Sequence, residues 1–176
     1  MVLVNETEAV AGVAREDAVF SFRRIIDFLV AEKVNHRVMV HPPEGQTVAA
    51  SLLRGHSVEQ AAKCMVVEVK HDNGQLSYVL AVVSGNRRVA LKNVAGFLEG
   101  VKAKLAPSHI ASQLTRCVMG AVPPISFDDR LQVVVDRGLL STEEIVFSAG
   151  RLDVSIGVNT DTYLNVIRHQ IGSISE

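Results

Sequence analysis

Lys63 is the residue of this chain whose position is best suited to chemistry. It begins the β-rich run Lys63 to Lys70 (KCMVVEVK), in which Met65, Val67 and Val69 occupy alternate positions. Because side chains alternate between the two faces of a strand, the lysine shares a face with these apolar residues. Such a lysine must extend past the strand end into solvent or meet an anionic partner. The spacing leaves both interpretations open: a rim lysine, or a cation that binds phosphate or a developing oxyanion.

The loop Gly120-Ala121-Val122-Pro123-Pro124 is a second candidate. Glycine lets a ligand approach backbone N–H groups closely, although Pro-Pro also serves as a stiff connector between a helix and a strand. Two cationic segments accompany the loop: Arg87-Arg88 with Lys92, in a predicted turn, and the strand exit Ser148-Ala149-Gly150-Arg151. We interpret their arginines as solvated residues or as phosphate contacts.

Other chemistries lack support in the sequence. No GxSxG, HExxH, GxxxxGK[ST] or GxGxxG motif occurs. His36 and His41 would lie on opposite faces of one strand, so we predict no metal site and no cofactor. Cys64 points away from the Lys63 face and is interpreted as a small buried hydrophobe instead of a nucleophile. Neither it nor Cys117 has a CxxC partner, which argues against zinc and against a structural disulfide.

The composition predicts one soluble domain. The chain has 176 residues, 48% hydrophobic and 21% charged, with a net charge of -1, which favours a folded core over disorder. Near-neutral charge argues against DNA binding and against a surface that coats nucleic acid, and leaves room for a small basic rim. The N-terminus lacks a signal-peptide pattern, and no apolar run is long enough for a membrane span. We therefore predict a cytoplasmic protein without membrane contact.

The elements that must position these residues alternate between helix and strand. Residues 1–15 are predicted to be a loose extension and residues 16–176 a single domain. A helix is predicted from Asp17 to Lys33, with Val19, Phe22, Ile26, Leu29 and Val30 on its apolar face. Two runs around Asp72-Asn73-Gly74 predict a β-hairpin, 63–70 with 77–84. Further strands are predicted at 37–41, 102–105, 131–136, 145–148 and 154–158, and further helices at 47–53, 91–98, 107–114 and 160–169. This order favours a mixed sheet over a doubly wound one.

Several segments, taken in order, resemble one known family. They are His41-Pro42-Pro43, Ala62-Lys63-Cys64-Met65-Val66-Val67, residues 78–83 (YVLAVV), Gly85-Asn86-Arg87-Arg88 with Leu91-Lys92, the Gly120 to Pro124 loop, Val135-Asp136 and residues 145–150 (IVFSAG). From about Phe22 to Ile167 the chain is similar to the YbaK family of aminoacyl-tRNA deacylases, which are related to the editing insertion domain of bacterial prolyl-tRNA synthetase.

The resemblance implies an α/β (α+β) fold with a mixed, barrel-like sheet flanked by helices. It also implies a trans-editing hydrolase that cleaves the ester bond of a mischarged aminoacyl-tRNA, with the tRNA acceptor end as partner and a synthetase as a possible second partner. Lys63 matches the lysine most closely tied to activity and would be a fixed cation. The residues implied to bind substrate are His41, Gly120, Ala121, Val122, Pro124, Asp136 and Gly150. Those implied to contact tRNA phosphates are Arg87, Arg88 and Arg151.

The chain departs from the family pattern beside the expected acyl pocket. Cys64 stands where the family usually has a hydroxyl residue, and Pro123 and Ile125 replace the serine and phenylalanine of the loop. These changes leave a second function open: a non-catalytic module that binds aminoacyl-tRNA or a related small ligand in regulation. Binding without turnover would distinguish that module from the enzyme. The acyl group itself is not indicated by any residue.

Overall fold

The computed structural model describes the chain from residue 7 and its side chains from residue 17. Helix α1 spans Thr7–Ala31, so it begins well before the expected start at Asp17, and residues 1–6 of the predicted extension lie outside the described part. The predicted apolar face of α1 is confirmed in part. Leu29 is 1% exposed, and Phe22 and Ile26 pack against the core. Val19 and Val30 are exposed, and Ile25, which the spacing did not select, is 1% exposed instead.

The strands form two sheets. A three-stranded antiparallel sheet has the order β1-β7-β6, and a five-stranded mixed sheet has the order β4-β2-β3-β5-β8. In the larger sheet β3 pairs with β5 and β5 with β8 in parallel, and the other pairs are antiparallel. The strands are β1 His36–Val40, β2 Ala62–Lys70, β3 Leu76–Ser84, β4 Lys102–Leu105, β5 Leu131–Asp136, β6 Glu144–Ser148, β7 Val154–Asn159 and β8 Gln170–Gly172.

The predicted hairpin is the centre of the larger sheet. β2 and β3 pair antiparallel from Ala62↔Ser84 to Lys70↔Leu76, which sets Lys63 opposite Val83. The turn between them contains Gly74 with a φ of 81°, a left-handed conformation that favours glycine. Each face of the hairpin is apolar because each face covers a separate core. Val66 and Leu80 belong to one core cluster, and Val67 and Val79 belong to the other.

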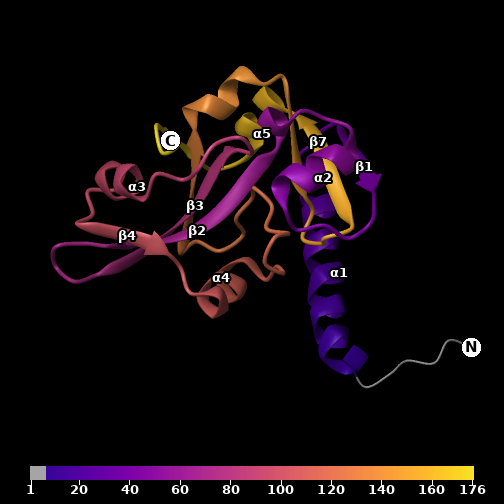
Figure 1. Ribbon diagram of the computed structural model, residues 1–176, viewed down its shortest axis with the longest axis horizontal. Helices are drawn as coiled ribbons and strands as arrows, with labels where there is room; N and C mark the ends of the chain where they lie inside the picture. The colour runs from indigo at the N-terminus through magenta and orange to yellow at the C-terminus, as the bar shows by residue number, and fades with distance from the viewer. Residues whose placement is uncertain (1–6) are drawn as a thin grey trace, which may run out of the picture.

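Short helices surround the sheets. In Figure 1, α2 lies over the smaller sheet, α4 lies below the hairpin, and α3 lies on the same side of the molecule as the turn of the hairpin. The helices are α2 Thr47–Arg54, α3 Leu91–Phe97, α4 Ser108–Thr115 and α5 Thr160–Val166, with 3-10 turns at Val58–Gln60 and Arg137–Ser141. α5 ends earlier than predicted because the chain turns into β8, a short strand that the sequence pattern did not indicate.

The two sheets touch at one point and then separate. An isolated parallel bridge joins Ala61, just before β2, to Val146 in β6. β4 pairs with β2 only from Val67 onward, so the part of β2 between these contacts has an open edge. The mixed α/β fold is as predicted, but the sheets do not close into a barrel. The candidate site lies in the gap that remains between the two sheets.

Candidate functional site

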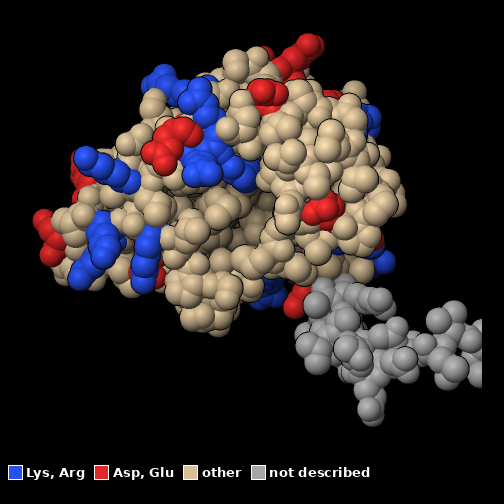
Figure 2. Space-filling model, in the orientation of Figure 1, with Lys and Arg blue, Asp and Glu red and all other residues tan. Residues whose placement is uncertain are grey.

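A cavity of about 340 Å³ occupies the gap where β2 and β6 diverge. Its walls come from α2, the start of β2, the segment 105–111, the loop around Gly120, and Ser148 at the end of β6. Figure 2 shows a hollow in this face with Lys and Arg side chains gathered at one rim. Most lining residues are small or apolar, so the cavity suits a small organic group whose charged part stays at the rim.

The open edge of β2 presents backbone polar groups to this cavity. The carbonyl of Val66 accepts a hydrogen bond from Ala106 N at 2.9 Å, so Val66 points its backbone groups toward β4. In an antiparallel strand, the residue two positions earlier points the same way. The N–H and C=O of Cys64 therefore face the cavity, at a place where neither β4 nor β6 pairs with the strand.

Lys63 lies at the rim, between the cavity and the turn after β3. Its side chain is partly buried and its Nζ donates a hydrogen bond to the carbonyl of Arg87. Burial lowers the pKa of Lys63, and the nearby charge of Arg88 lowers it further. The side chains of Arg87 and Arg88 are exposed. The predicted lysine and the predicted pair of arginines thus form one cationic rim.

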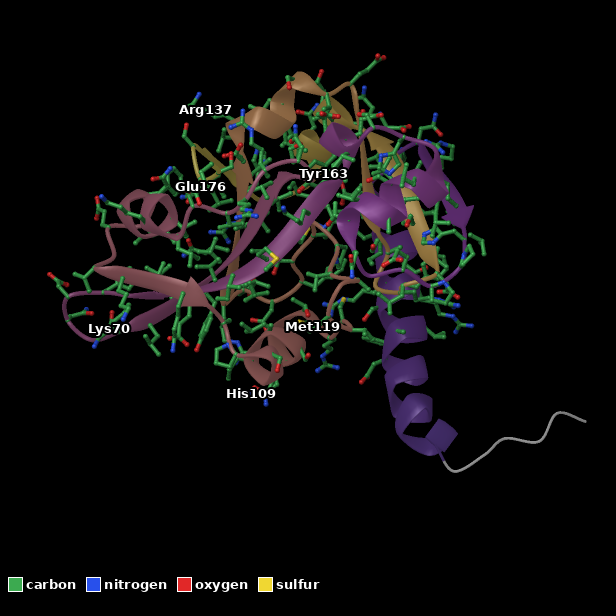
Figure 3. All side chains as sticks on the ribbon, in the orientation of Figure 1. Lys70, His109, Met119, Arg137, Tyr163 and Glu176 are labelled. Carbon is green, nitrogen blue, oxygen red and sulfur yellow. The ribbon has the colours of Figure 1, made fainter. Side chains whose placement is uncertain are left out.

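The loop after α4 forms another wall of the cavity. Gly120 has a φ of 88°, which favours glycine, and a Cβ there would stand 3.1 Å from Gly45 Cα, so a larger residue would push the two backbones apart. Gly120, Val122 and Met119, which is labelled in Figure 3, line the cavity. Ala121 does not line it. Its N–H donates to Val118 O at 3.0 Å and is thus already used within the loop.

Besides Ala121, four residues with implied substrate contacts lie outside the cavity lining. His41 bridges the Pro42 carbonyl and Ser155 Oγ, at 2.8 and 2.7 Å. The carbonyl of Pro124 accepts from the Tyr163 hydroxyl at 2.6 Å. Gly150 donates from its N–H to Ala121 O at 3.0 Å. These contacts tie together the segments around the cavity, and direct substrate contacts by these residues stay a prediction.

Asp136 is the fourth residue placed away from the cavity. It is 3% exposed, and its carboxylate accepts from Gly138 N, Ile174 N, Ser175 N and Ser175 Oγ. Its oxygens are fully engaged in holding the C-terminal segment against the end of β5. Arg151 forms a two-bond ion pair with Asp153 at 2.8 and 2.7 Å, and its role as a phosphate contact stays a prediction.

The three departures from the family pattern fall in different surroundings. Cys64 lines the cavity, and burial raises the pKa of its thiol, which keeps it protonated and unreactive as a nucleophile. Pro123 and Ile125 are buried, and Ile125 belongs to the larger core cluster. The two loop replacements therefore repack the interior and do not touch the cavity lining.

Arg54 and Ser148 are cavity residues that sequence reasoning did not select as substrate contacts. Arg54 comes from the last turn of α2 and donates from Nη2 to Ser148 Oγ at 2.9 Å. Burial lowers the pKa of Arg54. In the sequence, an arginine just before a helix-ending glycine resembles an ordinary C-terminal basic residue. Only the fold brings it to Ser148, 94 positions later.

The charged lining residues are few and of opposite sign. Among the lining residues that the structure describes, Glu44 carries the carboxylate, and Arg54 and Lys63 carry the cations. Glu44 Oε1 accepts from Gln46 N at 2.8 Å. From residue 17 onward, no group of three His, Cys, Asp or Glu side chains is arranged to hold a metal ion. No described helix is long and apolar enough to cross a membrane.

The mixed two-sheet fold of this domain has solved counterparts. The hypothetical protein APE2540 aligns with a TM-score of 0.77 and 21% identity, over 86% of this chain and 99% of its own. A proposed trans-editing enzyme for prolyl tRNA synthetase aligns with a TM-score of 0.74 and 23% identity, over 89% of this chain and 97% of its own.

Sequence comparison gives the family. The model of the aminoacyl-tRNA editing domain matches residues 41–166. The Multifunctional Ser/Thr-tRNA deacylase ProXp-y of Escherichia coli (strain K12) is 36% identical over 150 residues, which cover 85% of this chain and 89% of the relative. The chain therefore belongs to the aminoacyl-tRNA editing domain family, and the predicted resemblance is confirmed.

Proposed function

We propose that this protein is a freestanding deacylase that hydrolyses the ester between a small hydroxylated amino acid and the 3′ end of a mischarged tRNA. The observation that carries the proposal is Lys63 on a cationic rim above a small, mostly apolar cavity. The rim suits the phosphates of an acceptor end, and the cavity suits its aminoacyl group. The name of the Escherichia coli relative, a Ser/Thr-tRNA deacylase, supports the ester and the acyl class.

Hydrolysis of an aminoacyl ester does not require a nucleophile from the protein. An aminoacyl ester is already activated by the adjacent ammonium, and the ribose carries a neighbouring hydroxyl. Hydrolysis then needs a positioned water and stabilisation of the oxyanion more than a protein nucleophile. A protonated lysine has three N–H donors, and Lys63 uses one on the Arg87 carbonyl. The other two can hold the terminal phosphate or the ester carbonyl oxygen.

The remaining groups of the substrate have complementary partners in the cavity. The backbone N–H of Cys64, on the open edge of β2, and that of Gly120 are the candidate oxyanion donors. Glu44 is the candidate partner for the α-ammonium group, because it supplies the carboxylate of the lining. In this arrangement the protein orients the ester, and water directed by the substrate hydroxyls attacks it.

We also propose that another protein contributes part of the tRNA recognition. The net charge of the chain is -1, and its cationic rim is small. Most affinity for nucleic acid comes from phosphate contacts, so the chain alone would bind tRNA weakly. An aminoacyl-tRNA synthetase that holds the same tRNA would supply the missing contacts.

Deacylation of Ser-tRNA by Lys63→Ala tests the proposed function. We expect kcat/KM to fall about 100-fold, the scale of removing one oxyanion or phosphate contact. Lys70→Ala, at the other end of β2, is the matched control and should keep the wild-type value. If Lys63→Ala retained full activity on every mischarged tRNA of a panel, Lys63 would have no catalytic role. Wild-type protein that binds these tRNAs without turnover would identify the non-catalytic module instead.

A further inference from the structure

Arg54 is a cation of the cavity lining that has no acidic partner among the side chains described from residue 17 onward. Its Nη2 donates to Ser148 Oγ at 2.9 Å, and its Nε is buried with no hydrogen-bond partner among the same residues. None of the ion pairs found in the described part of the chain includes it. An unsatisfied buried donor on a charged group is costly, so a purely structural role does not explain this arrangement.

The neighbours of Arg54 do not neutralise it. His56 also has a buried ring nitrogen, Nε2, without a partner, and burial lowers the pKa of His56, which keeps the ring uncharged at neutral pH. The nearby carboxylate of Glu144 is engaged by Arg37 at 2.7 Å. The Nη1 group of Arg54 donates none of the hydrogen bonds found in the described part of the chain, and it remains available to an acceptor that enters the cavity.

The location of Arg54 relative to Lys63 decides which part of the substrate it meets. Lys63 on β2 and Ser148 on β6 each lie two residues beyond the bridge between Ala61 and Val146. They flank the gap from its two strands, and Arg54 is bonded to Ser148 on the β6 side. An ester held at the open edge of β2 would have Arg54 and Ser148 across the gap from it.

Resting on the proposed function, we propose that Arg54 and Ser148 bind the side-chain hydroxyl of the aminoacyl group and so determine acyl specificity. Ser148 Oγ accepts from Arg54, which leaves its own hydrogen free to donate to the substrate oxygen. The free N–H groups of Arg54 supply a second donor to the same oxygen. The α-ammonium group is repelled by Arg54 and attracted by Glu44, which fixes the orientation of the acyl group.

This pair distinguishes a hydroxyl from a hydrogen better than an apolar wall would. A pocket that only measures size separates substrates differing by one small group by about 10-fold to 200-fold, while a pocket built to hydrogen-bond a hydroxyl rejects the analogue without it more strongly. An alanyl group would displace water from Arg54 and Ser148 and leave their donors unpaired. Seryl and threonyl groups would satisfy them.

The test compares Ser-tRNA and Ala-tRNA made on one tRNA body, so that only the acyl hydroxyl differs. We expect the wild type to favour Ser-tRNA over Ala-tRNA in kcat/KM by more than about 200-fold, beyond the range of a pocket that only measures size. Arg54→Met should bring the ratio close to one, mainly by loss of Ser-tRNA hydrolysis, and Ser148→Ala should lower it partly. Arg54→Lys keeps the charge but removes the planar fork, and should restore only part of the ratio.

Other outcomes would overturn the assignment. Equal losses on Ser-tRNA and Ala-tRNA in Arg54→Met would mean that Arg54 holds the ester or a phosphate. A wild type that hydrolyses both equally would leave the proposed function standing and remove this specificity pair. Ser148→Ala is a small change that tests the pair even if Arg54→Met unfolds.

A binding assay tests the specificity pair even if the protein has no deacylase activity. If the wild type hydrolyses neither ester, non-hydrolysable 3′-seryl and 3′-alanyl amides of adenosine replace them in a calorimetric binding assay. Preference for the seryl amide that is lost in Arg54→Met would support the specificity pair without catalysis. Equal affinities would exclude it.

Discussion

At the scale of single residues, some charged side chains line the cavity and others hold the surrounding structure together. Burial and the number of hydrogen-bond partners distinguish the two groups. Lys63 and Arg54 line the cavity, and each has one side-chain hydrogen bond among the described residues. Asp136 has none of its acceptors unused, because four hydrogen bonds hold it to the segments after β5 and at the C-terminus. The residue resembles a family position tied to function, and its role here is to hold the chain end in place.

Asp136→Asn should therefore destabilise the protein without changing its chemistry. Oδ2 accepts from Gly138 N and Ser175 Oγ, while Oδ1 accepts from Ile174 N and Ser175 N. An amide has one acceptor oxygen, so its NH₂ group would face two of these donors. We expect the free energy of unfolding in urea to fall by about 2 kcal/mol.

The exposed Asp129→Asn, whose side chain reaches no core segment, is the control and should change stability by under about 0.5 kcal/mol. Measured at a temperature where both variants are folded, kcat/KM should match the wild type. A large loss of kcat/KM at unchanged stability would instead place Asp136 in contact with the substrate.

At the scale of elements, the crossing of Gly120 and Gly45 sets how closely two loops beside the cavity approach each other. A Cβ at Gly120 would stand 3.1 Å from Gly45 Cα. The Gly120 loop is also joined to the segment after β6 by the hydrogen bond from Gly150 N to Ala121 O. Gly74, in the turn of the hairpin, has a similar positive φ of 81° but open space around it. Comparing substitutions at Gly120 and Gly74 therefore separates the cost of the backbone conformation from the cost of the close contacts.

Gly120→Ala should cost stability and activity, whereas Gly74→Ala should cost stability alone. Each substitution places a Cβ in the left-handed region, at about 1–2 kcal/mol. At Gly120 the new Cβ also meets Gly45 Cα at 3.1 Å and Gly45 O at 3.2 Å, so the loop must move. We expect kcat/KM to fall at least about tenfold, because small misplacements of a bound ester are costly. Equal activity of both variants would show that the loop does not position the substrate.

The elements predicted well from sequence are those whose signals are local. The hairpin, with alternating apolar residues around Asn73-Gly74, and β5, residues 131–136, were recovered almost to the residue. β8 was missed because three residues carry too little pattern. The pairing of Arg54 with Ser148 could not be read from spacing, since it depends on the single bridge that joins the two sheets.

At the scale of the whole molecule, an almost neutral chain carries a local cationic rim. The chain has 18 basic and 19 acidic residues, yet Figure 2 shows basic side chains grouped beside the hollow. This rim includes Lys63, Arg87 and Arg88, and the charge of Arg88 lowers the pKa of Lys63. Local charge can thus orient an acceptor end even when net charge gives little long-range attraction.

Arg88→Gln should reduce the salt dependence of deacylation. If Arg88 contacts one phosphate of the single-stranded acceptor end, its loss should make the slope of log kcat/KM against log salt concentration less negative by about 0.7. Arg137→Gln, an equal charge change at another exposed position, should leave the slope unchanged. Loss of the Arg88 charge also raises the pKa of Lys63, so the lysine stays at least as fully protonated and the effect cannot arise from its titration. Equal slopes in both variants would mean that the rim acts only through Lys63 and that the tRNA phosphates bind elsewhere.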